Sequence, residues 1–149
     1  LLVDMIEAPD FVHELFETIT QIQLAILDEA LNYDLDAILF GDDWGQQNGL
    51  IFGARLWRKF IKPYIARLYS KVKQAGKAVF IHSCGKVQEL FPELIELGVD
   101  VFNPFQPEVM DVYEMKKQYG TQLCFYGGVS IQQILPFGSP AQVKEEVKK

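Results

Sequence analysis

Residues 79–85 read Val-Phe-Ile-His-Ser-Cys-Gly, a short apolar run that leads directly into a histidine, a cysteine and a glycine. The apolar run is typical of a buried β-strand. Successive side chains of a strand point to opposite faces, so His82 and Cys84 are predicted to share one face at the end of this strand. In α/β proteins, ligands bind at the carboxyl ends of the strands. An imidazole beside a thiolate is a ligand pair typical of zinc, although two ligands do not complete a site.

Around this segment, short apolar strands alternate with helical segments. Strands are predicted to begin near residues 36, 78, 99 and 122. Helices are predicted over about 9–31, 54–75 (broken near Lys62 by Pro63), 87–97, 112–119 and from Ser139 onward. This alternation predicts a parallel sheet with right-handed crossovers. Two architectures fit: part of a TIM-type (β/α)8 barrel, which needs about 250 residues in full, and a small open doubly wound sheet.

Composition limits the class of protein. The 149 residues suffice for a single domain, residues 1–149, with a hydrophobic core. The net charge of −6 argues against a nucleic-acid or anionic-membrane partner. There is no apolar run long enough to cross a bilayer and no signal-peptide pattern. Cys84 and Cys124 are expected to be free or metal-bound thiols of a cytoplasmic protein. An apolar start at Leu1 and a helical pattern at the other end indicate a fragment of a longer protein.

Two features of the predicted helices carry expectations of their own. The first helix has one apolar stripe, formed at spacings of three and four by Val12, Leu15, Ile19, Ile22 and Ile26. His13, beside that stripe, is expected to be a surface or helix-packing histidine. The arginines all fall in the second helix, where a solvated outer face is expected.

Polar residues and glycines follow the carboxyl end of each predicted strand. In strand order, they are Asp42 and Asp43 with Gln47, His82 and Cys84, Asn103 and Gln106, and Gly127 and Gly128. In either architecture these ends gather at one edge of the sheet. The Gly-Gly pair allows an anionic ligand to approach the backbone, although such pairs also occur in ordinary tight turns. The sequence therefore predicts a ligand site at this edge.

The strand ends together resemble the uroporphyrinogen decarboxylase-like superfamily. The resemblance rests on four ordered stretches: GDDWGQQ (41–47), FIHSCG (80–85), NPFQP (103–107) and FYGGV (125–129). That superfamily contains the haem-pathway decarboxylases and the cobalamin-dependent (corrinoid) methyltransferases. The resemblance covers nearly the whole chain and implies a TIM-type barrel, of which this chain would supply roughly the C-terminal half, with about four strands.

In the methyltransferase branch, a His-x-Cys segment and a distant third ligand hold zinc, which binds the methyl-accepting thiol as a thiolate. The resemblance implies that His82 and Cys84 are zinc ligands and that Asp42 and Asp43 act in catalysis beside them. The third ligand is expected outside this chain, because Cys124 is expected to be a core residue. The implied partners are a small-molecule thiol and a corrinoid, the methyl donor, on a partner protein.

The same resemblance assigns substrate-orienting roles to Gln47, Asn103 and Gln106, and close backbone approach to Gly127 and Gly128. One alternative is decarboxylation of uroporphyrinogen III in porphyrin biosynthesis. That reaction uses no metal, and arginines from an earlier part of the barrel bind the carboxylates of the tetrapyrrole substrate. A further alternative is a non-catalytic half barrel that associates with a second copy, as a homodimer, through its exposed sheet edges.

Overall fold

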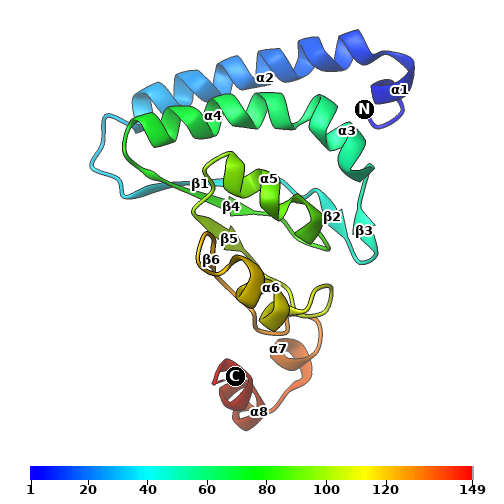
Figure 1. The fold of residues 1–149 in the computed structure, drawn as a ribbon, viewed down its shortest axis with the longest axis vertical. Coiled ribbons are helices and arrows are strands. Elements are labelled where there is room, and N and C mark those ends of the chain that lie inside the picture. Colours follow the sequence, from blue (N-terminus) through cyan, green and yellow to red (C-terminus); the bar gives the residue numbers. More distant parts are fainter. Residues whose placement is uncertain (149) are drawn as a thin grey trace.

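The computed structural model describes residues 1–148 and has a four-stranded parallel sheet at its centre (Figure 1). The strands are β1 (Ala37–Gly41), β4 (Ala78–His82), β5 (Val101–Asn103) and β6 (Cys124–Phe125). Their order in the sheet, β1-β4-β5-β6, follows their order along the chain, and every pair is parallel. Consecutive strands of a (β/α) barrel are arranged in this way, whereas a doubly wound sheet reverses its strand order. The prediction of a parallel α/β sheet from a TIM-type barrel is therefore confirmed.

The helices between the strands form largely where the sequence predicts them. The long ones are α2 (Pro9–Ala30), α3 (Gly53–Phe60), α4 (Lys62–Gln74), α6 (Val112–Tyr119) and α8 (Pro140–Val147), and a 3-10 turn (Gln88–Leu90) leads into α5 (Phe91–Glu96). The predicted break falls at Ile61, and Pro63 lies in the first turn of α4, where a backbone N–H has no helical partner. Among residues 1–148, no helix is long and apolar enough to cross a membrane.

The sequence pattern does not predict three short elements. They are α1 (Asp4–Glu7), α7 (Ile134–Phe137) and a hairpin of β2 (Gly45–Gln46) and β3 (Gly49–Leu50). Each has too few residues to show a helical or alternating apolar period. The acidic loop, with Asp42 and Asp43, lies between the carboxyl end of β1 and this hairpin.

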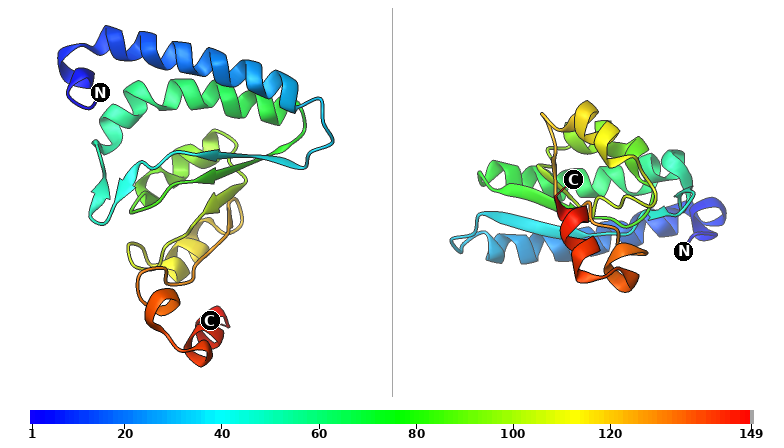
Figure 2. Two further views of the ribbon diagram at one scale, coloured as in Figure 1. Left: turned by 180° about the vertical axis from the view of Figure 1, so that it is seen from behind. Right: turned by 90° about the horizontal axis from the view of Figure 1, so that it is seen from below.

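The helices α4 and α2 lie in two layers on one side of the sheet (Figures 1 and 2). α4 packs directly on β4, and α2 packs on α4. The side chains between the helices and the sheet form the main core, in which the largest fully buried members are Trp57, Tyr69, Phe91, Phe102 and Ile81. This core holds the strands, and therefore their carboxyl ends, in a fixed register.

The predicted single stripe on α2 is wrong in part. Val12 is fully buried, but Ile22 and Ile26 are 58% and 61% exposed. The buried face of the helix instead runs through Val12, Thr20 and Leu27. α2 thus has two apolar faces, only one of which packs on α4, and a stripe of spacing three and four does not say which face is buried.

The two faces of the sheet differ in their cover. Val79, Ile81 and Phe102 point toward the helices and are buried, whereas Leu39 on the opposite face is 65% exposed. Cys124 pairs with Val101 on this same opposite face and is exposed. The expectation that Cys124 is a core residue is therefore wrong, because its strand position directs it away from the helices.

Candidate metal centre

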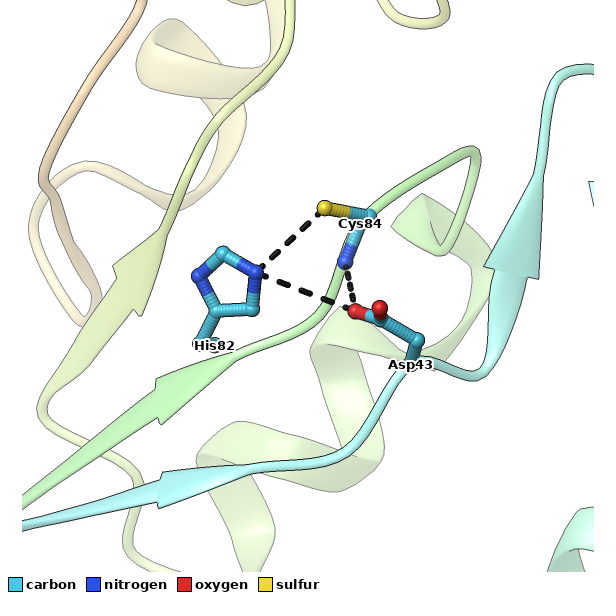
Figure 3. A group of neighbouring side chains, drawn as sticks. All are labelled: Asp43, His82 and Cys84. Atoms are coloured by element: carbon cyan, nitrogen blue, oxygen red, sulfur yellow. Dashed lines mark hydrogen bonds and ion pairs between the residues drawn. The ribbon is translucent and has the colours of Figure 1, made fainter.

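Three potential metal ligands come together at the carboxyl edge of the sheet (Figure 3). The ligand atoms of Asp43, His82 and Cys84 all lie within 4.8 Å of one another. His82 Nε2 lies 3.3 Å from Cys84 Sγ and 3.8 Å from Asp43 Oδ1. The structure thus joins the predicted His82 and Cys84 pair to one of the two predicted aspartates.

Strand alternation explains why Asp43, and not Asp42, joins this group. Gly41 pairs with His82, and the N–H of Asp42 continues the ladder by donating to the carbonyl of His82 at 2.9 Å. Asp43 therefore shares the face of His82, while Asp42 is turned toward the helical side. Consistent with this, the pKa of Tyr69 on α4 is raised, first by burial of its own hydroxyl and then by the negative charge of Asp42. Although Asp42 reaches solvent, burial of its carboxylate, and then the charge of Asp43, raise its pKa.

The loop that carries Asp43 is fastened to the turn that carries Cys84. Gly85 has φ +82°, and a Cβ there would lie 2.4 Å from the backbone carbon of Gly45. The N–H of Lys86 donates to the carbonyl of Gln46 at 2.9 Å. Only glycine allows this contact between two backbones. The sequence shows both glycines, but its pattern does not reveal that Gly45 and Gly85 face each other.

The carboxylate of Asp43 is oriented by the same turn. The backbone N–H of Cys84 donates to Asp43 Oδ1 at 2.7 Å. Burial raises the pKa of the Cys84 thiol. Asp43 raises this pKa further, through its negative charge and through a hydrogen bond with the thiol. The free protein therefore keeps a protonated thiol here, and a bound cation would have to displace that proton.

The remaining predicted site residues surround this group in different ways. Asn103 bonds to the ring of His82, with Oδ1 lying 2.6 Å from Nδ1. Gln106 is only 3% exposed, and its Oε1 accepts from the N–H of Gly85 at 3.4 Å. Gln47 is exposed in the turn of the β2–β3 hairpin. The substrate-binding roles of these residues stay predictions.

Gly127 and Gly128 approach another backbone. A Cβ at Gly127 would lie 1.8 Å from the carbonyl oxygen of Pro104, and the N–H of Gly128 donates to that oxygen at 3.1 Å. The pair thus holds the end of β6 against the end of β5. The approach of substrate to this backbone stays a prediction.

The three donors fit a zinc ion. Zinc takes thiolate sulfur at about 2.3 Å and imidazole nitrogen or carboxylate oxygen at about 2.0–2.2 Å, so tetrahedral donors lie about 3.3–3.6 Å apart. Two of the three donor separations, 3.3 Å and 3.8 Å, are within a few tenths of an ångström of this, and the third, between Cys84 Sγ and an Asp43 carboxylate oxygen, is within 4.8 Å. Three protein ligands leave the fourth position of a tetrahedral site for substrate, as in catalytic zinc centres.

A parallel sheet with helices on one face, and ligand-type side chains at its carboxyl edge, defines the class as part of a TIM-type barrel with its site at the catalytic end. A family model described as uroporphyrinogen decarboxylase (URO-D) matches residues 1–149. The chain therefore belongs to the uroporphyrinogen decarboxylase family.

Among solved structures, the fold is similar to that of a methyltransferase from Methanosarcina mazei, with a TM-score of 0.77 and 19% sequence identity. The match covers 97% of this chain and 41% of that one, so this chain spans less than half the length of the solved protein. At this identity, the likeness supports the fold. A comparison with curated protein sequences gives no significant match.

Proposed function

We propose that this chain is the metal-binding part of a zinc-dependent methyltransferase that passes a methyl group from a corrinoid to a small thiol. The observation that carries the proposal is the group of Asp43, His82 and Cys84, whose donor atoms lie within 4.8 Å of one another. The methyltransferase from Methanosarcina mazei, similar in fold, is consistent with this branch of the family.

In this proposal, the third ligand, which the sequence suggested was outside the chain, is Asp43. His82 presents Nε2 as a neutral donor, Cys84 gives up its thiol proton, and Asp43 supplies a carboxylate oxygen. A zinc ion bound by these donors would supply the positive charge that holds a substrate thiol as its nucleophilic thiolate at neutral pH. Cys84 as a thiolate and Asp43 as a carboxylate would together offset the charge of such an ion.

The other side chains at the edge hold the ligands. The N–H of Cys84 donates to Asp43, and Gln106 accepts from the N–H of Gly85 in the same turn. The side chains of His82 and Asp43 are 38% and 58% exposed, so the fourth position is open to a substrate from solvent. We assign the corrinoid to a partner protein that approaches this side, as the family resemblance implies.

Elemental analysis of the purified protein tests the proposal. We expect close to one zinc per chain, and we expect 2-mercaptoethanol to release a proton when it is added to the zinc-loaded protein at neutral pH, because a metal-bound thiol ionises. The matched control is Cys84→Ser, which should neither retain zinc nor release the proton. A protein that takes up no zinc would contradict the proposal.

The second candidate is the decarboxylation after which the family is named. It requires cationic groups for the substrate carboxylates. The arginines of this chain, however, lie on α3 and α4, on the helical side, and two of them, Arg58 and Arg67, are bound to Glu93 and Glu17. Absence of zinc, together with binding of a porphyrin bearing several carboxylates, would favour this reaction.

A further inference from the structure

We propose that Asn103 is a positioning residue that, together with the backbone carbonyl of Tyr126, fixes His82 in the tautomer that leaves Nε2 free to bind a metal. This inference rests on the proposed metal centre. It gives Asn103 a role different from the substrate contact predicted from the sequence.

The direction of the hydrogen bonds follows from the main chain. Asn103 Nδ2 donates to the carbonyl oxygen of Tyr126 at 2.9 Å. A carbonyl oxygen only accepts, so the amide nitrogen must face Tyr126 and Oδ1 must face the ring of His82. Oδ1 lies 2.6 Å from His82 Nδ1 and has no proton to give. Nδ1 is therefore the donor, and the neutral ring keeps its lone pair on Nε2.

That lone pair points at the other two donors. Nε2 lies 3.3 Å from Cys84 Sγ and 3.8 Å from Asp43 Oδ1 (Figure 3). In metal sites, the second ring nitrogen of a ligating histidine almost always donates to a carbonyl, a carboxylate or water, which fixes the ring and its tautomer. Asn103 Oδ1 occupies that place here.

The two glycines explain how the carbonyl of Tyr126 comes within reach. Gly127 has φ +131°, and a side chain there would collide with the carbonyl oxygen of Pro104. Gly128 donates its N–H to the same oxygen at 3.1 Å. This contact brings the end of β6 onto the end of β5, so that the residue before Gly127 presents its carbonyl to Asn103. The Gly-Gly pair thus contributes to the ligand geometry through the backbone.

The chain contains its own reference for a test of the tautomer. It has two histidines, His13 and His82. Tyr64 donates its hydroxyl proton to the carbonyl of His13 at 3.0 Å, so its oxygen accepts from His13 Nδ1 at 2.9 Å. His13 therefore has the same Nδ1–H tautomer for an unrelated reason. Because it lies on α2, it should not respond to changes at Asn103.

The experiment is long-range proton–nitrogen NMR of the imidazoles in the metal-free protein, with zinc affinity measured by chelator competition. The variants are Asn103→Ala, which removes the acceptor, and Asn103→Asp, which keeps one. Asn48→Ala, at an exposed amide in the β2–β3 turn, is the matched control.

We expect both histidines of the wild-type protein, and of the control, to be protonated at Nδ1. In Asn103→Ala, His82 should move toward the Nε2–H form while His13 stays unchanged, and zinc affinity should fall about 10- to 100-fold. Asn103→Asp should retain the Nδ1–H form and most of the affinity, a rescue that a purely structural role for Asn103 does not predict.

A wild-type His82 protonated at Nε2 would overturn the inference, whether or not Asn103→Ala folds. An unchanged His82 signal and zinc affinity in a folded Asn103→Ala would also overturn it. A wild-type protein that binds no zinc would contradict the proposed function instead, and the NMR of the metal-free protein would still decide the role of Asn103.

Discussion

On the helical side of the molecule, Glu93 accepts hydrogen bonds from Arg58 Nε at 2.7 Å and Lys62 Nζ at 2.9 Å. At the carboxyl edge of the sheet, Asp43 instead faces an imidazole and a thiol, and among residues 1–148 no lysine or arginine forms an ion pair with it. The paired charge stabilises the fold. The ligand-type side chains at the edge bond instead to one another and to the turn, and a cluster of titratable groups in such a place is typical of a functional site. The predictions below test this difference, from the largest expected effect to the smallest.

Loss of Cys84 should have the largest effect, on zinc affinity. Structural zinc sites bind with about 10–16 kcal/mol, so removal of one strong ligand in Cys84→Ser should cost about 4 kcal/mol, or about a thousandfold in affinity. Chelator competition measures it. Cys124→Ser removes the other thiol. Cys124 is exposed and pairs with Val101, two residues before Asn103 on β5, so this variant should leave zinc affinity unchanged. Equal affinities of the two variants would contradict the assignment.

The contact between Gly85 and Gly45 should be the most sensitive point of the edge for stability. Gly85→Ala forces an L-residue into φ +82° and places a Cβ 2.4 Å from backbone, and we expect a loss of about 3 kcal/mol or more in the free energy of unfolding. Gly76→Ala is matched, because Gly76 has φ +71° with no atom within 4 Å of its Cβ. It should lose only about 1 kcal/mol in urea denaturation. Similar losses in both would mean that the two loops are not fastened together here.

Substitutions of the two adjacent aspartates, Asp42 and Asp43, should differ in their effect on zinc affinity. Asp43→Asn keeps the shape of the side chain but removes its charge, so zinc affinity should fall about 10- to 100-fold, or about 1.4–2.7 kcal/mol. Asp42→Asn, on the other side of the strand, should bind zinc nearly as tightly as wild type. It should also raise the unfolding midpoint at neutral pH, since burial disfavours the carboxylate there. An equal loss of affinity in both variants would show that charge alone, without strand position, decides binding.

The smallest effect is expected on the helical side. Burial raises the pKa of Glu93, but hydrogen bonds from Lys62 and Arg58 outweigh it and lower the pKa below 4.5. The stabilisation is therefore present above about pH 4.5 and is lost as the pH falls toward the lower folded-state pKa. Glu93→Gln should lose about 1 kcal/mol at pH 7 and should show a weaker acid dependence than wild type in urea denaturation. Unchanged stability of Glu93→Gln at pH 7 would contradict the claim that the ion pairs of Glu93 stabilise the fold.

The sequence predicted the order of strands and helices because each long element carries its own period or cap. Asp111, directly before the predicted helix at 112–119, caps α6 by accepting from Tyr113 N and Glu114 N. The break before α4 followed in the same way from Pro63. The buried face of α2 could not be predicted, because that helix has apolar residues on two faces and tertiary packing selects between them.

For the site, the alternation of a strand was enough to pair His82 with Cys84. It was not enough to choose Asp43 over Asp42, because the strand continues past its apolar run through a hydrogen bond that the sequence does not reveal. The same limit applies to Asn103. Its predicted place at the edge is correct, but its bond to His82 depends on how the ends of β4, β5 and β6 lie side by side.

X-ray absorption at the zinc edge tests most directly whether the edge is a metal centre. The sample is zinc-loaded Cys124→Ser protein, so that Cys84 is its only source of protein sulfur ligand besides methionine. We predict one sulfur at about 2.3 Å with nitrogen and oxygen donors at about 2.0–2.2 Å, and a second sulfur when 2-mercaptoethanol is added. A zinc shell of nitrogen and oxygen alone, or a protein that holds no zinc, would contradict the account.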